Sequence, residues 1–291
     1  MKNEFQTNTA MKTIRNFLLL LSALLAFTAC EPTDQNQGTV PYANTGYFNH
    51  DWAMDKVWED GQAEVAHYDA ERVVYGKVRR FSYAYITVKE EFNKAFNVKT
   101  DDYQRDDLFS VMKVNKFASF QTDNYPYHYL SSLFFERKKP EQLYKFTHTA
   151  QEWCGNTFKQ FSVNPGGYDY DYNSYFDGAG DGKMELNGTD LLWEDQLSYV
   201  LRALRFEEGL KFSREVVESQ VNTRARRPTI YKADFVVTDA GDDWQVTVTL
   251  QNDRVSTYHF AKAYPHLMTA HQRWDGFSLK LHNVNRYQYW R

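Results

Sequence analysis

Residues 76–92, GKVRRFSYAYITVKEEF, decide the fold. From residue 81 onward, Phe81, Tyr83, Tyr85 and Thr87 alternate with smaller or branched residues. In a β-strand, successive side chains point to opposite faces, so a period of two with large residues on one face indicates a long strand. Aromatic residues make up 17% of the 291-residue chain, which also favours strands.

Similar runs of β-branched and aromatic residues follow along the chain, bounded by Gly, Pro, Asn and Asp. Those before the expected helix cover residues 63–92, 108–122, 125–137 and 144–163. Those after it cover residues 210–221, 229–238, 244–252, 256–264, 267–275, 277–285 and 286–291, with compact turns at 239–243, 251–254 and 274–276. Short strands at this spacing predict a mainly β (β-rich α+β) fold, a large antiparallel sheet forming a sandwich or half-barrel.

One helix is expected near residues 190–206, packed on the sheet. Asp190 is a suitable N-cap. One apolar stripe follows, made of Trp193, Leu197, Val200, Leu201 and Leu204. The domain prediction is a single β-rich domain over residues 51–291, with the alternative of two subdomains joined near 164–190, a stretch rich in Gly and Asp.

The N-terminus resembles a secretory signal. Starting from Met1 or Met11, a basic segment precedes an apolar run at 17–27 that is too short to remain as a membrane-spanning helix. The run ends in Phe-Thr-Ala-Cys, which is similar to a bacterial lipobox, so residues 1–29 are a predicted signal peptide and Cys30 the lipidated residue. The alternative is an ordinary signal peptide followed by an incidental cysteine.

Residues 30–50 are polar, contain Pro and Gly, and are expected to form a flexible lipid-anchored tether. Glu31 follows the cysteine, which favours the outer membrane, facing the periplasm or the cell surface. Residues 1–29 hold three basic residues and one acidic residue, so their removal changes the formal net charge from −4 to −6. This charge argues against nucleic acid as a partner. The expected partner is the membrane, through the anchor, and the oligomeric state is not predicted.

Cys154 lies in residues 149–161, TAQEWCGNTFKQF. If Cys30 carries lipid, Cys154 has no disulfide partner within the chain. In an extended strand, His148 would lie about 20 Å from it, and nothing in the spacing brings His128 near. A catalytic thiol needs a base, so we interpret Cys154 as structural, with a nucleophile as the alternative. We expect Trp153 and Cys154 on opposite faces of a central strand, one of them in the core.

Residues 177–182, DGAGDG, are similar in part to a calcium-binding loop. Asp177, Asp181 and Glu185 could form an irregular calcium site, although the chain departs from the EF-hand at two ligand positions. The alternative is a simple Gly/Asp turn. No zinc motif, P-loop or dinucleotide fingerprint occurs in the sequence, and no other cofactor is expected.

Two aromatic stretches, residues 125–129 (YPYHY) and 168–176 (YDYDYNSYF), could stack on a sugar or contact a lipid. The alternative is core packing of alternate residues. The candidate ligand-binding residues are Tyr125, Tyr127, His128, Trp153, Tyr168, Tyr170 and Tyr175.

Four segments resemble a group of secreted bacterial lipoproteins of unknown function, across most of the mature chain. They are residues 110–115 (SVMKVN), 124–134 (NYPYHYLSSLF), 151–158 (QEWCGNTF) and 174–181 (SYFDGAGD). Members of this group are sometimes labelled "septum formation inhibitor Maf", but this chain has no Ser-x-Ser-Pro-Arg-Arg phosphate-binding motif. The resemblance implies a lipoprotein with a β-rich fold and supplies no catalytic residue.

The sequence therefore predicts a lipid-anchored protein of the cell envelope with a non-enzymatic binding or structural role. Its ligand would be a lipid or a glycan held on a concave aromatic face. The alternative is an envelope hydrolase that uses Cys154 or acidic residues of the Asp/Gly-rich loop.

Overall fold

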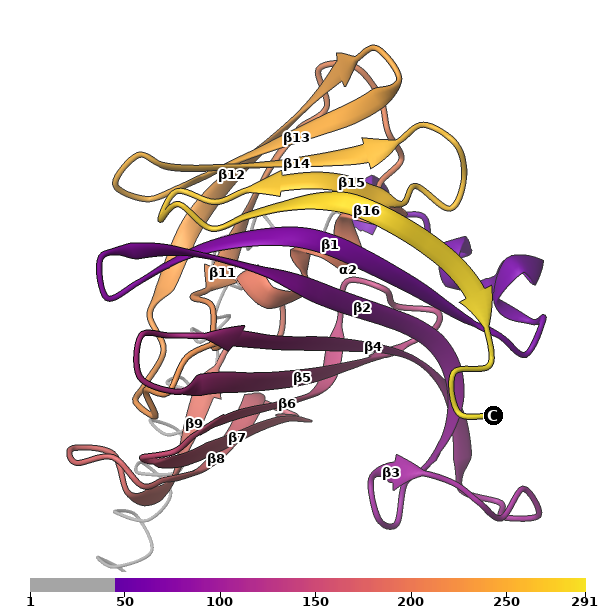
Figure 1. Ribbon diagram of the computed structural model, residues 1–291. Coiled ribbons are helices and arrows are strands. Elements are labelled where there is room, and N and C mark those ends of the chain that lie inside the picture. The colour runs from indigo at the N-terminus through magenta and orange to yellow at the C-terminus, as the bar shows by residue number, and fades with distance from the viewer. Residues whose placement is uncertain (1–44) are drawn as a thin grey trace, which may run out of the picture. The chain divides into compact units, whose positions relative to one another are not determined.

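The computed structural model describes residues 45–291, which form one 16-stranded sheet (Figure 1). The first eight strands are β1 (Ala63–Val74), β2 (Lys77–Asn93), β3 (Val98–Lys99), β4 (Leu108–Gln121), β5 (Pro126–Glu136), β6 (Leu143–Glu152), β7 (Gly155–Asn164) and β8 (Gly167–Ser174). The others are β9 (Asp181–Asn187), β10 (Leu192–Trp193), β11 (Lys211–Val217), β12 (Ile230–Ala240), β13 (Asp243–Leu250), β14 (Arg254–Ala261), β15 (Met268–Gln272) and β16 (Ser278–Tyr287). The predicted signal peptide and Cys30 lie outside the described residues.

The sheet is antiparallel apart from the short pair β10 and β11, and β1 pairs with β16 in its middle. The pairing order runs from β10 through β11–β16, β1, β2 and β4–β8 to β9, with β3 attached to β2. The two ends of this order, β9 and β10, are joined by residues 188–191 alone, so the sheet must curl back toward itself. This arrangement confirms the predicted β-rich fold with a large curved antiparallel sheet.

Strand β2 follows the alternation read from its sequence. Tyr83, Tyr85 and Thr87 are buried on the inner face, whereas Phe81, nearer the turn, is half-buried. The predicted turns at 239–243, 251–254 and 274–276 each join two strands. Residues 164–190 contain β8 and β9, which extend the sheet from β7.

The helical region is shorter than predicted and differs in character. It consists of η4 (Glu194–Gln196), α2 (Leu197–Val200) and η5 (Leu201–Ala203), and among the described residues no helix is long and apolar enough to cross a membrane. Asp190 is not its N-cap, because Asp190 pairs with Arg214 and strand β10 intervenes. The region is buried on every side rather than along one stripe, as expected for a helix enclosed by other elements. We call residues 194–203 the plug.

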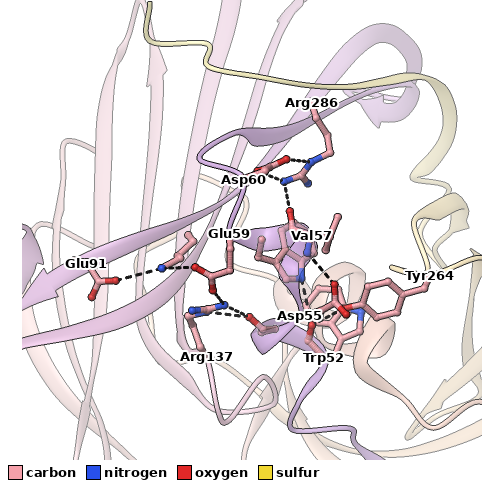
Figure 2. A network of polar contacts seen from close by, with 12 residues as sticks. Trp52, Asp55, Val57, Glu59, Asp60, Glu91, Arg137, Tyr264 and Arg286 are labelled. Carbon is pink, nitrogen blue, oxygen red and sulfur yellow. Dashed lines mark hydrogen bonds and ion pairs between the residues drawn. The ribbon is translucent and has the colours of Figure 1, made fainter.

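Two buried arginines join distant parts of the chain. Arg202 holds the plug to the sheet, and Arg137 joins the N-terminal turns to one another. Arg202 donates to both carboxylate oxygens of Glu64 on β1, at 2.7 and 2.9 Å, and its Nε donates to the carbonyl of Pro265 at 3.1 Å. Arg137 donates to the carbonyl of Ala53 and to Glu59 (Figure 2). Both arginine side chains are buried, so each fixes its neighbours through charge-assisted hydrogen bonds.

Short 3-10 turns precede the first strand: η1 (Thr45–Tyr47), η2 (Trp52–Met54) and η3 (Lys56–Trp58). Phe48 is 1% exposed and pairs with Leu204, so residues 45–50, the described part of the expected tether, already contact the folded body. Figure 2 shows Arg286 bonded to Asp60 and to the carbonyl of Val57, which ties these turns to β16.

Glu64→Gln should lower the free energy of unfolding by about 3–5 kcal/mol, because it leaves the buried Arg202 charge without its partner. Urea denaturation followed by tryptophan fluorescence measures this loss. The double variant Glu64→Leu/Arg202→Met should lose less, since no charge stays buried. The exposed pair of Glu71 and Arg80 supplies the control: Glu71→Gln should cost below about 1 kcal/mol. Equal losses of unfolding free energy in Glu64→Gln and Glu71→Gln would contradict a stabilising role for the buried pair of Glu64 and Arg202.

Candidate functional site

A row of polar side chains crosses the inner face of the sheet. The pairing registers place Tyr85 beside Lys116, Lys116 beside Ser131, Ser131 beside His148, and His148 beside Lys159. Directly paired residues of antiparallel strands point to the same face, so these five side chains, here called the polar row, lie side by side across β2, β4, β5, β6 and β7. All five are buried.

The two lysines of the polar row are held by neutral acceptors. The Lys116 ammonium donates to the carbonyl of Asp195 at 2.5 Å and to the hydroxyl of Ser198 at 2.7 Å. The Lys159 ammonium donates to the carbonyl of Gln220 and to Asn222 Oδ1, both at 3.0 Å. Within residues 45–291 neither lysine makes an ion pair. Burial therefore lowers the pKa of Lys116 to about 8 and that of Lys159 to about 7.

Two elements cover the polar row from inside the curve: the plug and the segment 218–222. Asp195 of the plug joins them, since its carboxylate accepts from Ser219 Oγ and from the Gln220 backbone N–H, both at 2.7 Å. Ser131 Oγ and His148 Nδ1 are 2.9 Å apart. Burial, and to a smaller extent the charge of Lys159, holds the pKa of His148 well below its usual value. The lysines, Ser131 and His148 Nδ1 therefore have polar partners, whereas His148 Nε2 has none among residues 45–291.

A small cavity of about 40 Å³ lies between the polar row, the plug and β14–β15. Its wall includes Lys116, Tyr83, Tyr85 and Tyr258. Arg72 closes one side, because its guanidinium donates to the carbonyl of Val221 at 2.9 Å and lies over the Tyr129 ring at 5.3 Å. The cavity is lined by both aromatic rings and charged or polar side chains.

Exposed aromatic side chains gather at one end of the sheet. Because neighbouring strands are antiparallel, the turns β1–β2, β4–β5, β6–β7 and β8–β9 all lie at this end, on the left in Figure 1. These turns carry Tyr75, Tyr125, Trp153 and Tyr175, which we call the aromatic rim. Tyr75, Trp153 and Tyr175 are 72%, 78% and 73% exposed, which is unusual for rings of this size.

The rim is built from ring contacts. The Tyr125 and Trp153 rings stack at 5.9 Å with an interplanar angle of 20°, and Tyr75 and Tyr127 share a hydrogen bond of 2.5 Å between their hydroxyls. The Tyr175 ring lies over Gly155, where a Cβ would come within 2.4 Å of it. Only glycine leaves room for this ring, so the β6–β7 turn and Tyr175 fit together.

The prediction that Trp153 and Cys154 lie on opposite faces of a central strand, one of them in the core, is wrong. Residues 144–163 form two strands rather than one, and Trp153 and Cys154 are the two turn residues between them. Both side chains are therefore exposed, and neither is in the core. Cys154 Sγ lies 2.9 Å from the Tyr125 hydroxyl, and this contact raises the pKa of Tyr125 to about 12. A phenol that stays protonated at neutral pH cannot act as the base for the thiol.

The other predicted binding residues are separated by the fold. Tyr125 and Trp153 stack at the rim, Tyr175 lies over Gly155 of the same turn as Trp153, and Tyr127 is buried beside Tyr125. His128 is exposed on the outer face of β5, because it is out of phase with its buried neighbours Tyr127 and Tyr129. Tyr168 and Tyr170 are each 1% exposed and pack in the main core.

The predicted calcium ligands are not brought together. Asp177 lies in the β8–β9 turn and accepts from the N–H of Gly178, while Asp181 on β9 accepts from Asn173. Glu185 lies further along β9. Within residues 45–291 no group of three or more His, Cys, Asp and Glu side chains is placed to hold a metal ion. Calcium binding stays a prediction.

Sequence reasoning missed Lys116, Lys159 and Asp195. A signal for the lysines was present: Lys116 alternates with Val114 and Ala118, in the phase that faces the core. Asp195 has no such signal, because its role depends on contacts with residues 219–220, distant in sequence.

The free energy of unfolding should rise between pH 7 and pH 9. A lysine in the unfolded chain keeps its proton to about pH 10.4, whereas folded Lys159 loses it near pH 7, so the unfolded state binds more protons in this window. Lys159→Met should reduce the rise by about 1–2 kcal/mol. The measurement is urea unfolding at pH 7, 8 and 9, with the exposed Lys232→Met as control. An undiminished rise in Lys159→Met would show that Lys159 stays charged in the fold.

Comparison with known proteins gives two structural likenesses. No protein-family model matches the chain, and curated proteins give no significant match. One similar crystal structure is a beta-barrel-like protein of the domain of unknown function DUF1849 from Brucella abortus, with 9% identity, TM-score 0.45, and coverage of 78% of this chain and 98% of that one. Another is a DUF1089 family protein from Pseudomonas aeruginosa, with 10% identity, TM-score 0.38, and coverage of 63% and 87%. At these values neither likeness indicates a ligand.

Proposed function

We propose that this protein is a non-enzymatic binding protein of the bacterial cell envelope, which is held at the outer membrane by lipid on Cys30 and binds a glycan on its aromatic rim. The observation that carries this proposal is the exposed stack of Trp153 on Tyr125 beside the exposed Tyr175. Large rings held by turns on a rigid sheet form a site that needs little ordering when a ligand arrives.

The chemistry of the rim suits a sugar. Aromatic faces contact the apolar C–H faces of sugar rings, and nearby polar groups bind the hydroxyls. At the rim, Glu152 and Asn156 flank the turn that carries Trp153, and the Tyr175 backbone N–H donates to the carbonyl of Asn156 at 3.0 Å. Ring faces and hydrogen-bonding groups therefore lie within one turn of each other.

A glycan is favoured over the other sequence-based candidate, a lipid. An acyl chain needs an apolar cavity of roughly 300 Å³ or more. The cavity beside Lys116 is about 40 Å³, and the one beside Arg202 is about 10 Å³. Two more open surface grooves measure about 650 and 490 Å³, and both carry charged residues: Asp69, Arg80 and Lys280 in the first, Lys94, Glu136 and Lys138 in the second. A rim that stacks on sugars needs no such cavity.

Trp153→Ala and Tyr175→Ala should each weaken glycan binding by about 2- to 10-fold, because each removes one stacking face. The assay is co-sedimentation with purified cell-wall sacculi, supported by a panel of immobilised envelope polysaccharides. Both residues are exposed, so the melting temperature should stay nearly unchanged.

The matched control is Trp290→Ala, since Trp290 is 51% exposed and follows β16 at the opposite end of the sheet. Binding that falls in Trp290→Ala but not in Trp153→Ala would refute the rim as the site. Binding to no glycan, together with recovery of a co-purified lipid by mass spectrometry, would favour the lipid alternative.

The anchor has a separate test. Cells fed an alkyne-labelled fatty acid should yield labelled wild-type protein, whereas Cys30→Ser should carry no label and leave the membrane fraction. Cys154→Ser serves as the matched control and should stay labelled, because the lipobox-like sequence precedes Cys30 alone. Labelling that survives in Cys30→Ser would contradict lipidation at this residue.

A further inference from the structure

We propose that the enclosed cavity beside Lys116 binds a small oxyanionic group, a carboxylate or a phosphate, at a site distinct from the aromatic rim. The cavity lies between the sheet and the plug, and its wall joins a buried ammonium to three buried phenols.

The first argument is the unbalanced charge of Lys116. An ammonium has three donors, and here two of them go to a carbonyl and a hydroxyl. The carboxylate of Asp195, the acidic residue that contributes this carbonyl, already accepts from Ser219 and from Gln220. The Asp195 charge offsets part of the cost of burying Lys116, and the Lys116 ammonium also lies 4.5 Å from the centre of the Tyr85 ring. No carboxylate bonds to this ammonium directly, and an anionic ligand would supply that partner.

The second argument is a set of unused donors. Tyr83, Tyr85 and Tyr258 line the cavity and are 4%, 9% and 2% exposed. Within residues 45–291, none of their hydroxyls makes a hydrogen bond to protein. Burial raises the pKa of all three, so the hydroxyls stay protonated and can donate to an anion.

The other charged groups around the cavity are carboxylates as well as cations. The charged and titratable residues in its wall, apart from the tyrosines, are Arg72, Lys116, Glu194, Asp195, His271 and Arg273. Glu194 accepts from the Ser219 N–H, and Arg273 is paired with Asp275 outside the wall. Burial keeps the pKa of His271 well below its usual value. Within residues 45–291, Arg72 and Lys116 are the cations of this wall that form no ion pair, and they stand beside the carboxylates of Glu194 and Asp195, which accept hydrogen bonds from neutral donors.

The size of the cavity selects the ligand. The cavity volume of about 40 Å³ would hold about three water molecules, or one group of four to five heavy atoms. A carboxylate or a phosphate fits this space, whereas a sugar ring does not. The anion is therefore either free or the terminal group of a larger molecule.

The test uses the full-length protein purified in an uncharged detergent. One arm titrates inorganic phosphate and acetate by calorimetry, and the other measures binding to phosphatidylcholine vesicles with and without phosphatidic acid. We expect saturable binding in at least one arm, weakened at least about tenfold in Lys116→Met and unchanged in the exposed Lys232→Met. Binding of the free anions assigns a soluble ligand, and binding of phosphatidic acid alone assigns a lipid headgroup.

Two further measurements keep the proposal open to refutation if Lys116→Met unfolds. Tyr85→Phe removes one hydroxyl and should weaken binding several-fold with little change in melting temperature. Affinity should also fall between pH 7 and pH 9, because the Lys116 pKa of about 8 means that the ammonium is lost in this range. No binding in either arm, or binding that Lys116→Met and Tyr85→Phe leave intact, would overturn the proposal.

Discussion

The ion pair between Arg202 and Glu64 is the contact on which the interior of this protein depends. The sheet is one continuous layer that curls, and its inner face would be open without an element inside the curve. The plug fills that space, and Arg202 fixes it to β1 through two hydrogen bonds and packs on the Trp52 ring at 5.1 Å. Charged groups are rarely buried unless paired, so this geometry restricts where the plug can sit. The position of Asp195 and Ser198 over Lys116 follows from it.

The polar row lowers stability and is retained inside an otherwise aromatic core. Burying two ammonium groups disfavours their charged forms, as the lowered pKa values of Lys116 and Lys159 show. Apolar residues at both positions would avoid this cost. One neighbouring row is apolar across β5–β7, with Leu133 beside Phe146 and Phe146 beside Phe161. The cavity at the Tyr85–Lys116 end of the row is where we propose that a ligand binds.

The fold could be predicted from sequence because alternation is a local signal. The alternation of Tyr83, Tyr85 and Thr87 identifies the inner face of β2 from the sequence of that strand alone. The β6–β7 turn was not predicted, because the residues between Glu152 and Gly155 are Trp and Cys rather than the usual turn residues, and Gly155 became informative only once Tyr175 was seen above it. The plug was predicted as an amphipathic helix because its sequence does not show where its buried polar members find partners: Gln196 bonds to Glu141 between β5 and β6, and Arg202 to Glu64 on β1. Site residues of this type depend on long-range contacts, which periodicity does not report.

The aromatic rim and the cavity share one wall, and this explains why both lie at the same end of the sheet. Val221 packs against the cluster of Phe120, Tyr127, Tyr129 and Ala150 beneath the rim, and it also lines the cavity. Its carbonyl accepts from Arg72, whose guanidinium covers Tyr129. Turns can carry exposed rings because their side chains need no partner strand, whereas buried charges need the rigid registers of the strands. Where turns and strands meet, the segment 218–222 lies between the cavity and the cluster beneath the rim.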